Sequence, residues 1–159
     1  MAPAIVPFTD EHISREYVAW LNDPEVVKYS EQRHMTHDLA TCQNYVWSMR
    51  KNGELWAILD GSVHIGNVSA HIDGPNRRAD ISIMLGESRG RGMGAKALRI
   101  VCKMLKEGGM RRLTIGTMAK NKPMIAIAQK NGFKIEAVRQ NHFLVNKTGV
   151  ALVEMGKFV

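Results

Sequence analysis

The hydrophobic residues of this chain recur at two spacings, and the change between them predicts where helices give way to strands. In the first third the spacing is three to four residues, as on one face of an amphipathic helix. The positions that share such faces are Tyr17, Trp20 and Leu21 in a first helix, and Leu39, Cys42, Val46 and Met49 in a later one. Thr36 is suited to cap the later helix and Gly53 to end it. We also expect a short helix begun by Asp23-Pro24 and a first strand at 4–8.

The middle of the chain changes from the helical spacing to the pattern of strands. Residues 55–59 are a short apolar run, and those at 63–72 and 79–85 largely alternate, with turn residues between the three stretches. Asp60-Gly61 between the first two is a strong hairpin signal. We therefore expect three consecutive antiparallel strands.

The last third returns to the helical spacing and then alternates again. Its predicted elements are a helix at 95–105, a strand at 111–118, a helix at 122–131 capped by Asn121, and strands at 133–138 and 151–159. Gly108-Gly109 and Gly132 stand where these helices should end. The complete order predicts a mixed α+β fold. We expect a mostly antiparallel twisted sheet of six or seven strands, flanked by about four helices.

Length and composition fit one domain spanning residues 1–159. The chain is 45% apolar and 23% charged, and it has no apolar run near the ~18 residues of a membrane span. Residues 1–12 lack a basic segment followed by an apolar one, so we expect no secretory signal. Cys42 and Cys102 lack the spacing of a metal or redox pair, and no two histidines form a helical ligand pair. We therefore expect a cytoplasmic protein with reduced, buried thiols, no metal and no membrane partner.

The net charge of +7 and the pI near 9.6 indicate an anionic partner. A phosphorylated cofactor, an acidic substrate and nucleic acid all fit this charge. The basic residues are scattered, with only the short pairs Arg77-Arg78 and Arg111-Arg112, whereas a nucleic-acid surface usually shows a denser stripe. We therefore expect no nucleic acid, although a nucleic-acid-binding protein stays an alternative on charge alone.

Three glycines at alternate positions, Gly90, Gly92 and Gly94, lie between the strand at 79–85 and the helix at 95–105. Glycines let a ligand approach the backbone, and a helix N-terminus presents free amides and a positive dipole. This arrangement predicts a pyrophosphate site, although such a loop can also be only a tight turn. A nucleotide-hydrolysing loop would end in Gly-Lys-Ser/Thr, and a dinucleotide site would read G-x-G-x-x-G in a parallel unit. Neither pattern is present.

The pattern that remains, Arg89-x-x-Gly92-x-Gly94, resembles the loop of the GNAT (GCN5-related N-acetyltransferase) family. The resemblance covers most of the chain and includes YVAWLNDPEVVKYS, HIGNVSAHI, ADISIML, RGRGMGAKAL and an N-x-x-x-I-A-x-x-x-N-G-F pattern from 121 to 133. It is most similar to the RimJ/RimL-like branch, which acetylates ribosomal-protein N-termini and related amines. The opening segment resembles a subgroup found near surface-sugar biosynthesis genes.

The resemblance implies a GNAT-like fold with acetyl-CoA as acyl donor. The loop amides would hold the pyrophosphate, the preceding strand would lie along the pantetheine arm, and a backbone N–H of Met84 or Leu85 would face the carbonyl oxygen. The residues expected at the pyrophosphate and the arm are Ile83, Met84, Leu85, Arg89, Gly90, Arg91, Gly92, Met93, Gly94, Ala95 and Asn121. Lys130 is expected at the ribose 3′-phosphate, which Lys122 and Arg99 could also reach, although a solvated helix face is the alternative for all three.

Acetyl transfer to an amine needs a group that takes a proton from the nucleophile. We favour Asp80, because it matches the acidic residue of A-E-I-G in relatives, and Ser82 on the same side of the strand would orient water or substrate. A solvated carboxylate is the alternative for Asp80, and His71 and His142 are rival bases. Many relatives place a general-acid Tyr where this chain has Ala128.

The irregular segment YSEQRHMTH is predicted to cap the cofactor cleft on the acceptor side. The predicted acceptor contacts are Tyr29, Glu31, Arg33 and His71, whereas Trp47 and Trp56 are expected to pack in the core. We expect direct attack of a small amine, amino sugar or protein N-terminus on acetyl-CoA in a ternary complex, because neither cysteine has an evident base partner. A non-catalytic acyl-CoA-binding module is the alternative, and the sequence leaves a homodimer open.

Overall fold

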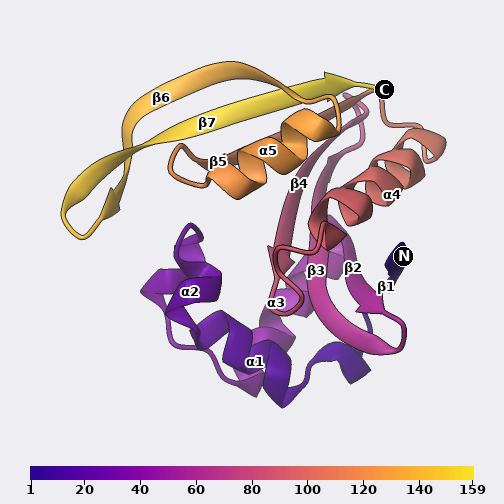
Figure 1. The fold of residues 1–159 in the computed structure, drawn as a ribbon. Helices are drawn as coiled ribbons and strands as arrows, with labels where there is room; N and C mark the ends of the chain where they lie inside the picture. Colours follow the sequence, from indigo (N-terminus) through magenta and orange to yellow (C-terminus); the bar gives the residue numbers. More distant parts are fainter.

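The computed structural model describes all residues, 1–159, and its seven strands form one twisted sheet (Figure 1). The strands are β1 (Ala4–Pro7), β2 (Gly53–Asp60), β3 (Val63–Asp73), β4 (Arg78–Leu85), β5 (Arg112–Met118), β6 (Lys134–Val145) and β7 (Thr148–Phe158). Their order in the sheet is β1-β2-β3-β4-β5-β7-β6, and every neighbouring pair is antiparallel except β4 and β5. The predicted α+β class and mostly antiparallel sheet are confirmed.

Five α-helices accompany the sheet where about four were expected. They are α1 (Arg15–Asn22), α2 (Pro24–Val27), α3 (Leu39–Asn52), α4 (Met93–Glu107) and α5 (Lys122–Lys130), with the 3₁₀ turns η1 (Asp10–His12) and η2 (Glu31–His34). α1 and α2 are separate because Asp23 between them adopts an extended backbone and accepts a hydrogen bond from the Glu25 N–H. None of these helices combines the length and the hydrophobicity of a membrane-spanning segment.

The start of α3 differs from the prediction. Asp38, and not Thr36, is its N-cap, because Asp38 and Thr41 form a reciprocal capping box in which each side chain accepts the other's backbone N–H. Leu39 consequently lies in the first turn and is half exposed. The core prediction for Trp56 is confirmed, but that for Trp47 is wrong, because its ring lies on the outer face of α3 beneath the Lys51 ammonium, 3.5 Å from the ring centroid.

Two apolar clusters cover the two faces of the sheet, and β2 contributes alternately to both. Trp56 and Ile58 face a cluster that includes α4 and α5, whereas Leu55 and Ala57 face a cluster that includes α1 and α3. This alternation follows from the two-residue period of a strand. Figure 1 shows α4 and α5 in front of the sheet. The tip of the β6–β7 hairpin and α2 both lie at the left of this view.

Two histidines lie in an aromatic cluster beneath α1. The His64 ring is stacked with Tyr17 and makes edge contacts with Trp20 and His12, and its Nε2 lies 2.8 Å from Asn67 Oδ1. Burial is the main cause that lowers the pKa of both imidazoles. In the folded protein His12 and His64 therefore stay neutral at pH values where the same two histidines of the unfolded chain are already protonated.

We expect this cluster to make the protein less stable in mild acid. The free energy of unfolding should fall as the pH drops through about 6.5, the value for an unfolded histidine, toward the lower folded pKa. Thermal unfolding at pH 7.5 and 5.5 measures the effect, and His64→Gln should show a smaller loss of Tm than the wild type. The exposed residue His142 provides the control, because His142→Gln should keep the wild-type loss. An unchanged loss in His64→Gln would contradict this role of His64.

Candidate active site

A wedge opens between β4 and β5, the one parallel pair in the sheet. Their pairing extends only from Arg78↔Arg112 to Asp80↔Thr114, so the remaining residues of both strands diverge. The next antiparallel pair, β5 with β7, is continuous over the whole of β5. The β4–β5 ladder therefore opens into a wedge, and its vertex is at Asp80.

The hydrogen bonds of β4 show which of its backbone groups face this wedge. Its pairing with β3 is unbroken, and it continues through the Gly86 N–H, which donates to the Ile65 carbonyl at 2.9 Å. In an antiparallel pair, the backbone N–H groups of alternate residues donate to the neighbouring strand. The N–H of Met84 therefore points to β3, as that of Gly86 does, and the N–H groups of Ile83 and Leu85 point to the wedge. The sequence predicted that the N–H of Met84 or of Leu85 faces the cofactor. The N–H of Leu85 is on the open side, that of Met84 is not, and the N–H of Ile83 is a further candidate.

The glycine loop after β4 leads directly into the N-terminus of α4. Gly90 and Gly92 have φ of +81° and +76°, and a Cβ at either would meet no atom within 4 Å. Gly92 is the N-cap of α4, and no side chain caps this helix. The amides of the first turn, beginning at Met93, are consequently left for a ligand, which fits the anion site expected from the sequence.

The two arginines of the loop have different surroundings. Arg91 donates to Asp60 Oδ2 at 3.1 Å and to the Ser88 hydroxyl at 3.2 Å, which fastens the loop to the β2–β3 turn. Arg89 is exposed and takes part in no ion pair. Arg89 is therefore the freer of the two cations for an incoming phosphate.

Gly86, which the sequence analysis missed, supports the loop from the other face of the sheet. A Cβ there would lie 2.0 Å from Trp20 Cδ2, so the indole of α1 packs directly on the Gly86 backbone. The Trp20 Nε1–H also donates to Glu87 Oε1 at 3.2 Å. A glycine directly after an apolar strand was the available signal, but its partner is 66 residues earlier in the chain.

α5 holds the other side of the loop. As predicted, Asn121 caps α5: its Oδ1 accepts from the Met124 N–H, and its Nδ2 donates to Thr117. At the far end of α5, the buried Asn131 Nδ2 donates to the carbonyls of Ala95 (3.1 Å) and Ile127 (3.0 Å). This second asparagine, whose role the sequence did not indicate, ties α5 to the first turn of α4.

Asp80 and Ser82 lie on the exposed face of β4, opposite the buried Ile81. The Thr114 hydroxyl donates to Asp80 Oδ1 at 2.7 Å, which fixes this carboxylate at the vertex of the wedge. The register with β3 places His71 opposite Asp80. The structure thus brings three of the predicted residues to one surface, with their polar groups accessible.

Tyr45 of α3 was not expected near this surface. Tyr45 is 38% exposed, and partial burial of its phenol raises the pKa, a rise that the nearby Ser69 side chain offsets in part. Ser69 is directly opposite Ser82 in the β3–β4 register. Nothing in the helical pattern of α3 indicated this contact, because periodicity does not show which strand a helix covers.

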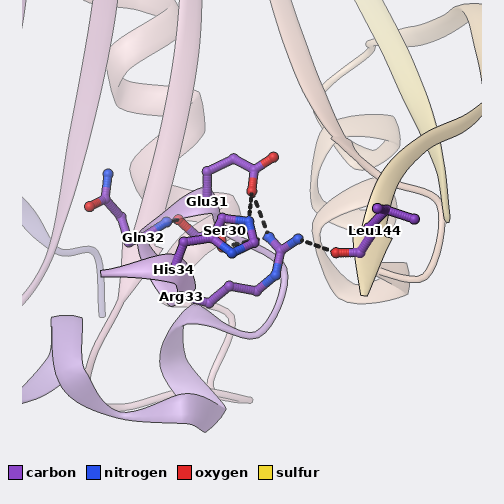
Figure 2. A network of polar contacts seen from close by, with 6 residues as sticks. All are labelled: Ser30, Glu31, Gln32, Arg33, His34 and Leu144. Carbon is purple, nitrogen blue, oxygen red and sulfur yellow. Dashed lines mark hydrogen bonds and ion pairs between the residues drawn. The ribbon is translucent and has the colours of Figure 1, made fainter. Parts of the chain in front are cut away.

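The η2 segment is joined to the β6–β7 hairpin by Arg33, as Figure 2 shows. Its guanidinium donates to the Leu144 carbonyl at 2.9 Å, and also to the Ser30 carbonyl and to Glu31 Oε2, both at 2.9 Å. The same Glu31 carboxylate contacts His34 Nε2 at 2.7 Å. Arg33 is therefore held as a bridge between two segments that are 111 residues apart in the sequence.

Neither cysteine is suited to act as a nucleophile. Cys42 and Cys102 are both buried, as expected, and burial raises the pKa of both thiols, that of Cys102 to about 11. A thiol in this state carries little thiolate at neutral pH. No group of three His, Cys, Asp or Glu side chains is arranged to hold a metal ion.

The candidate site therefore combines a glycine loop, a helix N-terminus without a side-chain cap and a wedge between two parallel strands. Residues 4–134 match the model of the acetyltransferase (GNAT) domain, so the chain belongs to the GNAT family of acetyltransferases. This confirms the family that the sequence predicted. A search of curated proteins gives no match.

Solved structures of the same fold include three relevant enzymes. The ribosomal L7/L12 α-N-protein acetyltransferase RimL, in complex with coenzyme A, has a TM-score of 0.90 at 15% identity, over 100% of this chain and 95% of that one. The microcin C7 self-immunity acetyltransferase MccE, in complex with acetyl-CoA and AMP, has a TM-score of 0.85 at 18% identity, over 99% and 93%. A ribosomal-protein-alanine N-acetyltransferase from Brucella melitensis has a TM-score of 0.83 at 18% identity, over 98% and 99%.

Proposed function

We propose that residues 1–159 form one catalytic domain that transfers the acetyl group of acetyl-CoA directly to a primary amine. The observation that carries this proposal is the wedge between β4 and β5, which leads from Asp80 to the uncapped N-terminus of α4. An extended pantetheine arm fits a gap lined by backbone amides, and a pyrophosphate fits a helix N-terminus. Neighbours of the same fold that hold acetyl-CoA or coenzyme A support this choice of donor.

The cofactor residues follow from this placement. The amides from Gly90 to Ala95 hold the pyrophosphate, and Arg89 adds positive charge beside them. Lys130, the exposed last residue of α5, binds the ribose phosphate. The pantetheine arm starts from the loop and runs back along β4 toward Asp80. The thioester at its end therefore lies beyond Leu85, closer to the vertex of the wedge. We assign the Ile83 N–H as the donor to the carbonyl oxygen, because it faces the wedge and lies closer to Asp80.

Asp80 attracts the ammonium form of the acceptor and passes its proton to solvent. The Thr114 hydroxyl fixes the carboxylate orientation, and the exposed Ser82 hydroxyl is placed two residues along the same face of β4. Ala128 is fully buried where many relatives carry a tyrosine, so it supplies no acid to the leaving thiol. A thiol needs little help to depart as thiolate, since its pKa is about 8.5.

The acceptor enters from the side of η2 and the β6–β7 hairpin. We assign Tyr29, Glu31, Arg33 and His71 to this side, with Arg33 acting as the bridge that holds its two segments together. The acceptor is a small amine, an amino sugar or a protein N-terminus. Transfer is direct, because the pKa of each buried thiol is raised and neither is available as an acyl carrier.

Release of free thiol from acetyl-CoA in the presence of an amine panel tests this function. We expect turnover with at least one amine, and we expect coenzyme A to raise the Tm, because a ligand that binds the native state stabilises it. Gly92→Ala should reduce the rise in Tm, because alanine is strained at φ +76°, whereas Gly74→Ala, in open space without a positive φ, should not. Coenzyme A binding without turnover on any amine would instead indicate a non-catalytic module.

A further inference from the structure

The charge of this protein is divided unevenly along its chain. Residues 89–159 carry 15 of the 22 Lys and Arg but only three of the 15 Asp and Glu, a net charge of +12 against −5 for residues 1–88. The pyrophosphate loop accounts for two of these cations. The fold therefore concentrates more positive charge on α4, α5 and β5 to β7 than the loop uses.

Part of this excess surrounds one hollow, of about 250 Å³, between α4 and the end of β7. We call it the α4–β7 hollow, and its lining residues are Arg99, Cys102, Lys103, Lys106, Lys157, Phe158 and Val159. Three of the four cations come from α4 with spacings of four and three residues, which place them on one helical face. The scattered basic residues of the sequence thus form a compact cationic surface.

These cations are largely free to bind an external anion. Arg99, Lys106 and Lys157 take part in no ion pair, and Lys103 has only a long contact of 3.8 Å with Glu107. Unpaired cations gathered around a concavity focus a positive potential, which favours binding of an anion. Such an arrangement is not needed for folding, because the like charges repel one another.

An aromatic ring borders the same hollow. Phe158 is 75% exposed, although it is a large apolar residue in a strand, and the Arg112 guanidinium lies 5.7 Å from its ring centroid. An exposed aromatic ring beside a row of cations is the combination with which proteins hold single-stranded nucleic acid. The cations contact the phosphates, and a base stacks on the ring.

The hollow is separate from the proposed acetyl-CoA site. The proposed pyrophosphate site is at the N-cap Gly92. At 1.5 Å per residue, Arg99, Lys103 and Lys106 follow it on α4 by about 10, 16 and 21 Å, so the two lysines are the cations farthest from the donor. The wedge begins on the other side of the loop, at β4. A ligand of the hollow can therefore bind without displacing the donor.

We propose that the α4–β7 hollow binds single-stranded nucleic acid, with phosphates on Arg99, Lys103, Lys106 and Lys157 and a base on Phe158. A strand with flexible, unstacked bases fits a concavity of nucleotide size better than a rigid duplex does. An acidic protein segment would satisfy the cations but would leave the exposed part of the Phe158 ring without a group that stacks on it.

Fluorescence anisotropy with labelled twelve-nucleotide oligo(U) and oligo(dT) tests the proposal, using the double variant Lys103→Gln/Lys106→Gln. We expect this variant to bind the oligonucleotides at least fivefold more weakly than Lys28→Gln/Lys51→Gln, a control that loses the same charge at α2 and α3, away from the hollow. The slope of log K against log salt should fall by about 1.4, from two lost phosphate contacts at about 0.7 each. Phe158→Ala should weaken oligonucleotide binding and leave inorganic polyphosphate binding unchanged.

Three results would overturn the proposal. The first is equal affinity of the hollow variant and the control variant for the oligonucleotides. The second is a raised KM for acetyl-CoA in Lys103→Gln/Lys106→Gln, which would assign the hollow to the donor. The third is tighter binding of a twelve-residue poly-glutamate than of the oligonucleotides together with no effect of Phe158→Ala, which would assign it to an acidic protein partner.

Discussion

Gly86→Ala is expected to lower the free energy of unfolding by about 3 kcal/mol and the Tm by roughly 10 °C. The new Cβ would lie 2.0 Å from Trp20 Cδ2 and 2.2 Å from Cε2, and the indole is only 5% exposed, so the backbone or the whole of α1 has to move. Because Gly86 leads into the glycine loop, the KM for acetyl-CoA should also rise. Thermal unfolding and steady-state kinetics measure the two effects.

Gly74→Ala is the matched control for this substitution. Its Cβ would meet no atom within 4 Å, and its φ is not positive, so it should change stability by less than about 1 kcal/mol. A second test places Gly86→Ala in a Trp20→Leu background. If the indole causes the clash, the alanine should cost about 1 to 2 kcal/mol less there than in the wild type. Equal costs in the two backgrounds would show that the strain arises elsewhere.

Asp80→Asn is expected to reduce kcat about 100-fold at neutral pH, with little change in the KM for acetyl-CoA. The amide has the size of the carboxylate and can still accept the 2.7 Å hydrogen bond from Thr114, but it can neither carry the charge nor take a proton. The fold and the Tm should consequently be preserved. Steady-state kinetics with the best amine from the panel, from pH 6 to 9, measure the loss and any change in the pH profile.

Glu16→Gln removes an exposed carboxylate from α1 and serves as the matched control, with an expected kcat within twofold of the wild type. The rival base is His71, which lies opposite Asp80 in the β3–β4 register. If Asp80→Asn retains most of its activity and His71→Gln does not, the histidine is the base. That pair of results would leave acetyl transfer intact as the function and overturn only the assignment of Asp80.

The elements of the fold were predictable because each depends on local pattern. The alternation at 79–85 gave β4, the helical spacing of Leu98, Cys102 and Leu105 gave α4, and Gly109 and Gly132 ended their helices with positive φ as expected. The start of α3 was placed wrongly because two capping residues were available, and Asp38 forms a reciprocal box with Thr41.

The candidate site was predictable only in part. The loop glycines and Arg89 stood out because a positive φ and a cation beside a helix N-terminus are properties of short segments. Sequence spacing could not decide between the amides of Met84 and Leu85, because that depends on which neighbour each residue of β4 faces. The unbroken β3–β4 ladder, which continues through the Gly86 N–H to the Ile65 carbonyl, supplied this information.

By itself, the sequence determined the order of the helices and strands, the glycine loop before α4 and the family to which these belong. Only the tertiary structure decided the packing of Trp20 on Gly86, the bridge from Arg33 to Leu144, and the grouping of Arg99, Lys103, Lys106 and Lys157 around one hollow. The physical reason is the range of the interactions. Periodicity and backbone dihedral angles are set within a few residues, whereas these contacts form between segments that only the folded sheet brings together.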